Sequence, residues 1–417
     1  ACKRQFPRFQ RLLTFIIARD LSMKRLFLLT ACLLALTACT AAQTSVPAAS
    51  PAPTSAPAPT EAPAPTPTTV PFSVPAPYSD LSYLPELSWD AAHQKQTYQP
   101  GEYDRLSLNT YSFNDRTVLA GAEEETAALL EAGRDPGLGV RSLQARSITG
   151  QGVNVAIIDQ PLLTDHPEIS DAIVDYYDAG GHTDEGTMHG PAVASILAGK
   201  TIGVAPGAHI YYAVTPGTAD SRPYADALHY ILTLNDTLPE SEKIRAVSVS
   251  ANPGNANFFE NAGLWQAALS DAEDAGLLVL TVQGASAGSA RLVPGLAAFD
   301  PAQRDNPAAC RMGQPGAFLI TPLARKNPNY VGVPCAYRTV AEEYISGQCG
   351  YRYDVQGGLS WGIPYCVGVM ALGWQVAPAL TNEEMLTLLV STAAPTADGA
   401  RMIDPVKFIE AVESRYK

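Results

Sequence analysis

One serine is placed so that its hydroxyl could act as a nucleophile. Ser360 lies between Gly358 and Gly362, where a loop turns into an apolar segment. Small neighbours permit a tight turn and a close approach of a substrate backbone. If a helix begins there, its unpaired N–H groups and its dipole suit an anion that forms beside the hydroxyl. Such chemistry also needs a base and an acid that orients the base.

The order of these groups along the chain distinguishes the possible arrangements. The pattern Gly358-x-Ser360-x-Gly362 matches the nucleophile elbow of α/β-hydrolases, in which an acid and then a histidine follow the serine. The last of the six histidines is His229, so this arrangement is excluded. The other arrangement places an aspartate and then a histidine before the serine. The ordinary alternative is a serine that only caps a helix.

The candidate acid and base lie at the ends of two predicted elements. Asp159 directly follows the apolar run 153–158, which predicts a buried strand, and functional groups gather at the carboxyl ends of parallel strands. His189 precedes a predicted helix that Pro191 opens and Gly199 closes. The positive end of a helix keeps a histidine neutral and able to act as a base. The alternatives are a turn aspartate and a surface or capping histidine.

The elements that would carry these residues alternate between strand and helix. This alternation predicts an α/β fold with a mostly parallel central sheet flanked by helices. Residues 160–185 and 289–316 are predicted to be rich in loops. Further strands are expected at 209–214, 244–250, 277–282 and 318–321, and helices at 120–132, 225–234, 262–275, 360–376, 382–391 and 405–415.

The first 38 residues have the pattern of an export signal. Residues 1–22 are basic and are expected to be an upstream extension, with a fragment boundary as the alternative. Residues 23–38 read as a signal peptide, with a basic start and an apolar run at 26–36. Cys39 follows small residues, which resembles a bacterial lipobox, so we expect it to carry lipid. An ordinary signal peptide or an uncleaved membrane helix are the alternatives.

The rest of the chain divides into three segments. Residues 39–77 are rich in Pro, Ala and Thr and are expected to form an extended tether. Residues 78–137 are expected to be an N-terminal extension that packs on the main domain, residues 138–417. With a lipid on Cys39, this domain would be held at the extracellular face of the bacterial cell membrane.

Composition excludes several classes of partner. The net charge is −13, and residues 1–38 hold seven Lys/Arg and one Asp, so the chain from Cys39 carries −13 − 6 = −19. An acidic protein of this kind argues against nucleic-acid binding and against basic patches for anionic lipid. Four cysteines beyond the tether allow two disulfides of open connectivity, and no Cys/His spacing indicates a metal; Cys366 is the candidate for a buried free thiol. The four are Cys310, Cys335, Cys349 and Cys366.

Three segments together resemble the subtilisin-like serine proteases, the subtilase family. Residues 150–159 are similar to the aspartate segment of that family, and residues 189–194 with 203–206 to its histidine segment. Residues 358–364 resemble its serine segment, including the proline four residues after the serine. The resemblance covers residues 138–395 and implies the subtilisin-like three-layer fold.

The resemblance also implies functional roles for individual residues. Asp159, His189 and Ser360 would form the catalytic triad of a serine endopeptidase, and Ser250 and Gly284 would bind substrate. The substrate would be a peptide or protein, the protein a monomer, and no cofactor is required. A structural calcium would be unsurprising, but the acidic residues 165–178 match no calcium-loop template and read more simply as a solvated surface.

Some positions depart from the family pattern. The residue aligned with the oxyanion-binding asparagine is Ala285, with Gln283 and Ser286 as possible substitutes. Loss of one oxyanion donor slows such enzymes by roughly a hundred- to a thousandfold. The departures support a second hypothesis, a weak or inactive subtilase-like domain that binds peptides or cell-surface components. An esterase or amidase with the same triad is a third.

Overall fold

The computed structural model of the protein describes residues 73–82, 89–90, 95–180, 187–345 and 348–416. These residues belong to one compact unit, Val70–Lys417. The predicted signal peptide, Cys39 and almost all of the tether lie outside the described residues. No helix within the described residues is long and apolar enough to cross a membrane.

The main domain is built on a parallel sheet of five strands in the order β6-β7-β5-β8-β9. All neighbouring pairs are parallel, as the alternation of strands and helices predicts. The predicted loop at 160–185 is wrong in part, because β6 lies within it. Strand β6 lies at the edge of the sheet and is only half buried, and it contains the polar residues Asp175 and Asp178. The sequence pattern therefore did not indicate a strand. The strands are β5 Asn154–Asp159, β6 Ile173–Asp178, β7 His209–Val214, β8 Ile244–Val249 and β9 Leu278–Thr281.

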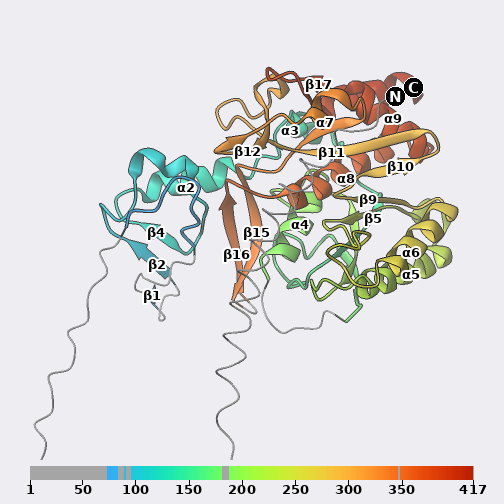
Figure 1. Ribbon diagram of the computed structural model, residues 1–417, viewed down its shortest axis with the longest axis horizontal. Coiled ribbons are helices and arrows are strands. Elements are labelled where there is room, and N and C mark those ends of the chain that lie inside the picture. The colour runs from blue at the N-terminus through green and yellow to red at the C-terminus, as the bar shows by residue number, and fades with distance from the viewer. Residues whose placement is uncertain (1–72, 83–88, 91–94, 181–186, 346–347, 417) are drawn as a thin grey trace, which may run out of the picture. The chain divides into compact units, whose positions relative to one another are not determined.

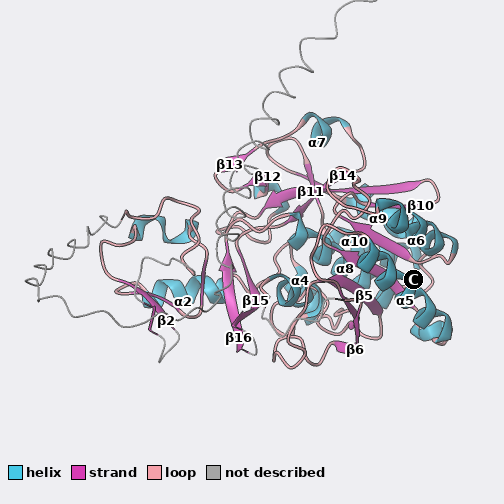
Figure 2. Cartoon of the chain, turned by 60° about the horizontal axis from the view of Figure 1, so that its bottom comes forward, coloured by secondary structure: helices cyan, strands magenta, loops and turns pink. Residues whose placement is uncertain are grey.

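Helices cover both faces of this sheet and give three layers (Figures 1 and 2). Side chains alternate between the two faces of a strand. In β5, Val155 and Ile157 pack in the cluster with α4 and α8, whereas Ala156 and Ile158 pack in the cluster with α5 and α6. The helices are α4 His189–Ala198, α5 Arg222–Thr237, α6 Ala262–Asp274 and α8 Leu359–Val376.

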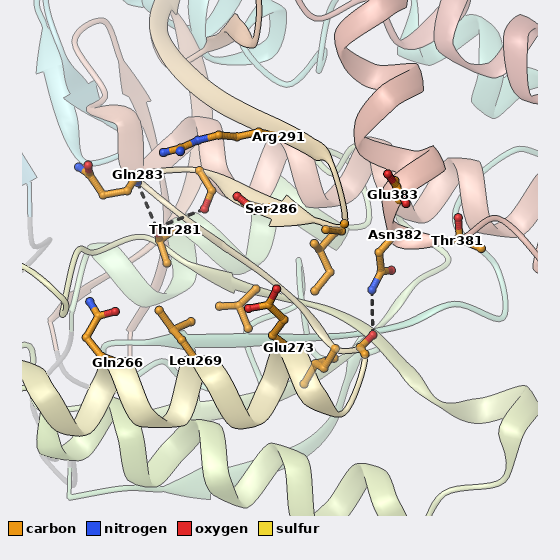
Figure 3. Close-up of a pocket in the computed structure, with 18 residues that line it drawn as sticks. Gln266, Leu269, Glu273, Thr281, Gln283, Ser286, Arg291, Thr381, Asn382 and Glu383 are labelled. Carbon is orange, nitrogen blue, oxygen red and sulfur yellow. Dashed lines mark hydrogen bonds between the residues drawn. The ribbon is translucent and has the colours of Figure 1, made fainter.

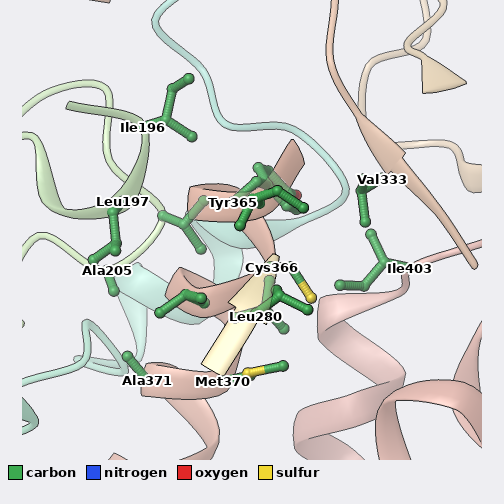
Figure 4. Close-up of a cluster of buried hydrophobic side chains, with 14 of the residues drawn as sticks. Ile196, Leu197, Ala205, Leu280, Val333, Tyr365, Cys366, Met370, Ala371 and Ile403 are labelled. Carbon is green, nitrogen blue, oxygen red and sulfur yellow. The ribbon is translucent and has the colours of Figure 1, made fainter. Parts of the chain in front are cut away.

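Helix α8 forms the centre of the larger core. Fourteen of its residues, Trp361 to Trp374, are buried. Figure 4 shows Cys366 and Met370 of this helix among side chains of α4, β9 and a further strand, including Leu197, Leu280 and Val333. This packing fixes the position of the helix start, where Ser360 lies.

A second, mixed sheet follows in the chain and corrects the prediction of loops at 289–316. Strands β11 and β14 pair in parallel, and β11 also pairs with β10 and β12. Strand β11 was not predicted because it contains Gly, Pro and Ala, which are poor strand formers. The predicted strand at 318–321 is reduced to β13, and Thr321 instead caps α7. The elements are β10 Ala285–Ala287, β11 Ala290–Ala298, β12 Arg311–Gln314, β13 Ala317–Phe318, α7 Pro322–Lys326, β14 Tyr330–Pro334, α9 Asn382–Thr392, β17 Ala394–Pro395, β18 Arg401–Met402 and α10 Pro405–Tyr416.

The N-terminal extension shares a hydrophobic core with the main domain. Leu81, Tyr98 and Phe113 of the extension pack in one cluster with Tyr337 and Tyr353 of the main domain. Strand β3 of the extension also pairs with β16 of a long hairpin, β15–β16, that the sequence analysis did not predict. The elements are β1 Trp89–Asp90, β2 Lys95–Tyr98, β3 Phe113–Asn114, β4 Thr117–Leu119, α2 Glu123–Ala132, α3 Val140–Ala145, β15 Arg338–Ile345 and β16 Gln348–Asp354.

A buried carboxyl group lies where the hairpin meets the extension. Glu342 is 0% exposed, and neither of its carboxylate oxygens forms a well-aligned hydrogen bond. Burial raises the pKa of Glu342 from 4.5 to about 7; Arg352 and Asn114 lower it, and Asp115 and Asp80 raise it. Because the folded pKa is the higher one, the folded state loses stability as the pH rises from about 4.5 to 7.

Glu342→Gln is therefore expected to stabilise the protein at high pH. Between pH 5 and pH 8 the free energy of unfolding of the variant should rise relative to wild type by on the order of 1–3 kcal/mol. Urea unfolding at both pH values measures this difference, and Glu240→Gln, at an exposed position, serves as the control. An identical difference at pH 5 and pH 8 would contradict the charge state assigned to Glu342.

Candidate active site

Asp159 and His189 are joined by a short hydrogen bond. Asp159 ends β5, and the alternation along this strand turns its side chain to the face that α4 and α8 cover. His189 begins α4, and its Nδ1 lies 2.5 Å from Oδ1 of Asp159. The exposed fractions of the two side chains are 23% for His189 and 5% for Asp159. The carboxylate thus holds the imidazole and leaves Nε2 free to accept a proton.

The environment sets the protonation of His189. Burial by itself lowers the pKa of His189, but the charge of Asp159 and its hydrogen bond raise it, and the net pKa lies above the ordinary 6.5. A buried carboxylate therefore stabilises the imidazolium that would form when the base takes up a proton.

Ser360 is the second residue of α8, which begins after Gly358. Its backbone N–H is one of the first N–H groups of the helix, which have no partner within the helix. Four residues later, Pro364 has no N–H to donate to the carbonyl of Ser360. The hydroxyl of Ser250 donates to that carbonyl instead, at 2.8 Å. The helix start is thus connected to the end of β8, where Ser250 follows Val249.

Ser250→Ala is expected to destabilise the helix start. Loss of the hydroxyl that donates to the Ser360 carbonyl should lower the free energy of unfolding by about 1 kcal/mol, measured by urea unfolding. Ser248→Ala is a matched control, because Ser248 lies in β8 two residues before Ser250, is 1% exposed, and its hydroxyl has no hydrogen-bond partner among the described residues. An equal loss in both variants would show that the bond contributes nothing.

The hydroxyl of Ser360 is hydrogen-bonded to a backbone carbonyl in this structure. It donates to the carbonyl of Ser250 at 3.2 Å. Within the part of the chain that the structure describes, no hydrogen bond joins Ser360 to His189. The next residue, Trp361, lies beside the base, with 5.1 Å between the ring centroids of Trp361 and His189. The three predicted catalytic residues are therefore on neighbouring elements, and rotation of the Ser360 side chain would redirect its hydroxyl.

A cavity of about 650 Å³ lies between α6 and the β10–β11 hairpin, and the residues that line it do not include Asp159, His189, Ser250 or Ser360. Thr281 pairs with Val249, and Val282 N–H donates to Ala251, so the turn after β9 runs beside Ser250. The cavity starts at this turn and continues along α6. Figure 3 shows Gln266, Leu269 and Glu273 of α6 on one side, and Ser286 and Arg291 of the β10–β11 hairpin on the other.

Gly284 and its neighbours line the cavity, but Gly284 also has a structural role. Its φ is +108°, and a Cβ would lie 2.1 Å from the carbonyl oxygen of Leu292. No side chain is compatible with this position. Ala285 is buried, pairs with Leu292, and has no side-chain donor. Gln283 and Ser286 are exposed and line the cavity.

Glu168, one of the acidic residues of 165–178, forms several hydrogen bonds within the protein. Glu168 is buried and accepts from the N–H groups of Thr201 and Ile202 and from the hydroxyls of Thr201 and Tyr351. No group of His, Cys, Asp and Glu able to hold a metal occurs among the residues described. Cys310, Cys335, Cys349 and Cys366 are all free thiols, and Cys366 is buried, as expected for it.

The central part of the chain is similar to a known protein family. Residues 150–335 match the model of the subtilase family. The matched segment contains Asp159 and His189 and ends before Ser360. Among solved structures, the chain is similar to the prenylagaramide maturation protease PagA, with 16% sequence identity and a TM-score of 0.46, over 66% of this chain and 98% of that one.

The match to this family supports a serine-type peptidase activity that acts on peptides or proteins. The mixed α/β fold with a parallel sheet agrees with the fold that the sequence predicts. The roles of single residues, the lipid anchor and the oligomeric state stay predictions.

Proposed function

We propose that this protein is a serine endopeptidase with Asp159, His189 and Ser360 as its catalytic triad. Ser360 attacks the peptide carbonyl, His189 takes the hydroxyl proton and passes it to the leaving amine, and Asp159 holds the imidazole and stabilises the imidazolium. The observation that carries this proposal is the 2.5 Å hydrogen bond between His189 and Asp159, beside a helix that presents Ser360 in its first turn.

The oxyanion would lie at the start of α8. The N–H of Ser360 is one donor for it, and the exposed Gln283 and Ser286 are the candidates for a second. The hydroxyl of Ser360 has to leave the carbonyl of Ser250 before it attacks. Catalytic hydrogen bonds are often long or absent in unliganded enzymes and form only with substrate.

Ser250 and Gly284 are proposed to contact substrate from two sides. Ser250 directly follows β8 and donates to the carbonyl of Ser360, and Gly284, which follows the next strand β9, lines the cavity. A substrate side chain would enter this cavity. Its length along α6, from Gln266 to Glu273, is seven residues, or about 10 Å.

Cleavage of internal peptide bonds tests the proposal directly. The purified full chain is incubated with unfolded proteins, and the products are identified by mass spectrometry, with Ser360→Ala as the control. Internal cuts in the wild-type reaction alone support an endopeptidase. Products that are only single residues from a chain end, or no products from folded enzyme, contradict it.

A second candidate function is peptide binding without cleavage. The observation that favours it is the hydroxyl of Ser360, which is bonded to Ser250 and not to His189. The same incubation distinguishes the two, because a binding domain would retain peptides intact and release no fragments.

We also propose that the peptidase is exported and anchored by lipid on Cys39, with residues 40–77 as a tether. The support is the sequence pattern of residues 23–39. Growth with an alkyne-bearing fatty acid should label the wild-type chain and not Cys39→Ala. Labelling of both would show that the lipid is attached to another residue. Labelling of neither would contradict the proposed lipid anchor.

A further inference from the structure

The residue after Ser360 forms part of the wall around the base. Trp361 is 3% exposed, and its ring is tilted by 47° to that of His189 at a centroid distance of 5.1 Å. Asp159 holds the imidazole through a single bond at Nδ1, which leaves the ring free to pivot. The indole limits that pivot, because it occupies the space on one side of the imidazole.

Two contacts hold the indole of Trp361 in one position. Its Nε1–H donates to Oδ2 of Asp354 at 3.1 Å. The backbone at Gly357 passes so close that a Cβ there would lie 1.9 Å from Cδ1 of Trp361. Gly357 is therefore required by the packed indole, and this packing gives the ring little room to move.

Asp354 is in turn held by the N-terminal extension. It ends β16 and is 7% exposed, and the hydroxyl of Ser112 donates to its Oδ1 at 3.2 Å. The N–H of Gln356 donates to the same oxygen at 3.0 Å. Ser112 also accepts from the N–H of Val355 at 3.1 Å. Two side chains, Asp354 and Trp361, thus connect the extension to the base.

We propose that Trp361 is a positioning residue for His189, and that Asp354 and Ser112 make this positioning depend on the docked N-terminal extension. The inference rests on the proposed role of His189 as the general base. A displacement of the base by about 1 Å can slow a reaction on the order of a hundredfold. Residues far from the substrate, on the extension, would then influence the rate through the indole.

Variants of the full chain at Asp354 and Trp361 test this inference. Asp354→Ala is expected to lower kcat for a peptide substrate and the rate constant of fluorophosphonate labelling by about tenfold or more, with KM changed less than about twofold. Asp354→Asn keeps an acceptor oxygen for Trp361 and should restore most of the rate. Ser112→Ala should give an intermediate rate.

Trp361→Phe keeps a smaller aromatic ring beside His189 and removes the Nε1–H donor. Its matched control is Trp374→Phe, because Trp374 lies on the same helix, is buried, and donates its Nε1–H to the carbonyl of Leu380 at 3.0 Å. Both variants lose one buried hydrogen bond, so both should lose similar stability. Only Trp361→Phe should lower the rate per folded molecule, by severalfold. Equal rates in the two variants, or an unchanged rate in Asp354→Ala, would overturn the inference.

A readout without catalysis separates this inference from the proposed function. The ring protons of His189 should show a ring-current shift in the NMR spectrum, since the indole lies beside them. Asp354→Ala should reduce the shift, and Trp374→Phe should leave it unchanged. If the wild type is folded but cleaves nothing, the peptidase proposal fails, and an unchanged His189 shift in Asp354→Ala would overturn the positioning inference independently.

Discussion

Replacing Ser360 with alanine is expected to lower kcat for peptide hydrolysis on the order of 10⁶-fold, because the variant has no nucleophile. The fold should persist, since Ser360 is only half buried and its carbonyl can still accept from Ser250. The measurement is the initial rate of hydrolysis of a quenched fluorescent peptide, chosen from the cleavage sites found in the wild-type digest.

A control separates loss of chemistry from loss of structure. Ser414→Ala changes an exposed serine on α10 whose hydroxyl donates to the carbonyl of Glu410 within its own helix. It should hydrolyse the peptide at the wild-type rate. Hydrolysis by Ser360→Ala within about tenfold of wild type would show that another residue is the nucleophile.

Asp159→Asn is expected to have the second-largest effect, on the order of 10⁴-fold in kcat. The asparagine fits the same space but stabilises the imidazolium of His189 poorly and favours the wrong tautomer. Asp404→Asn is a suitable control, because Asp404 is also a buried carboxylate, 6% exposed, and accepts the N–H of Lys407 at the start of α10. It should leave kcat within about twofold of wild type.

The pH dependence of the two enzymes should also differ. His189 acts as a base only when neutral, so the rate should rise with pH through its pKa, which lies above 6.5 in the wild type. Without the charge and hydrogen bond of Asp159, burial alone acts on the imidazole, and the pKa falls. The midpoint of the acid limb of kcat/KM should therefore move to lower pH in Asp159→Asn. A midpoint that stays or rises would contradict the interaction of Asp159 with His189.

The sequence predicted the elements that are continuous apolar segments with clear start or end signals. The apolar run of β5 ends at Asp159, and Pro191 and Gly199 delimit α4, so the strand end and the helix start could be placed from local pattern alone. Chain order then excluded the α/β-hydrolase arrangement. The core helix α8 was predicted from its apolar composition, although Pro364 lies inside it.

Other elements could not be predicted because their patterns are polar or weak. The hairpin β15–β16 contains Glu342, Glu343 and Arg352, which are buried against the N-terminal extension and α4. Buried charges are rare without partners, and Arg352 has its partners Asp80 and Ser82 more than 200 positions away in the sequence. From the sequence alone, a strand of such polar composition is predicted to be a loop.

Two features of the candidate site were also missed. The contact of Trp361 with His189 requires that α8 and α4 pack, which no local pattern shows. The bond from Ser250 to Ser360 spans 110 residues, but a signal existed, because Pro364 leaves the carbonyl four residues before it without a helical donor. A proline inside a predicted helix near a functional residue thus indicates that another side chain supplies the missing donor.

The most direct test of the central claim is to map the adduct of a fluorophosphonate on the intact protein. The full chain is treated with the probe, digested, and analysed by tandem mass spectrometry, with Ser360→Ala and Asp159→Asn treated in parallel. We expect one adduct, on Ser360, in the wild type, none in Ser360→Ala, and much slower labelling in Asp159→Asn. No adduct on folded wild-type protein, or an adduct on another residue, would contradict the account of Ser360 as a nucleophile activated by His189 and Asp159.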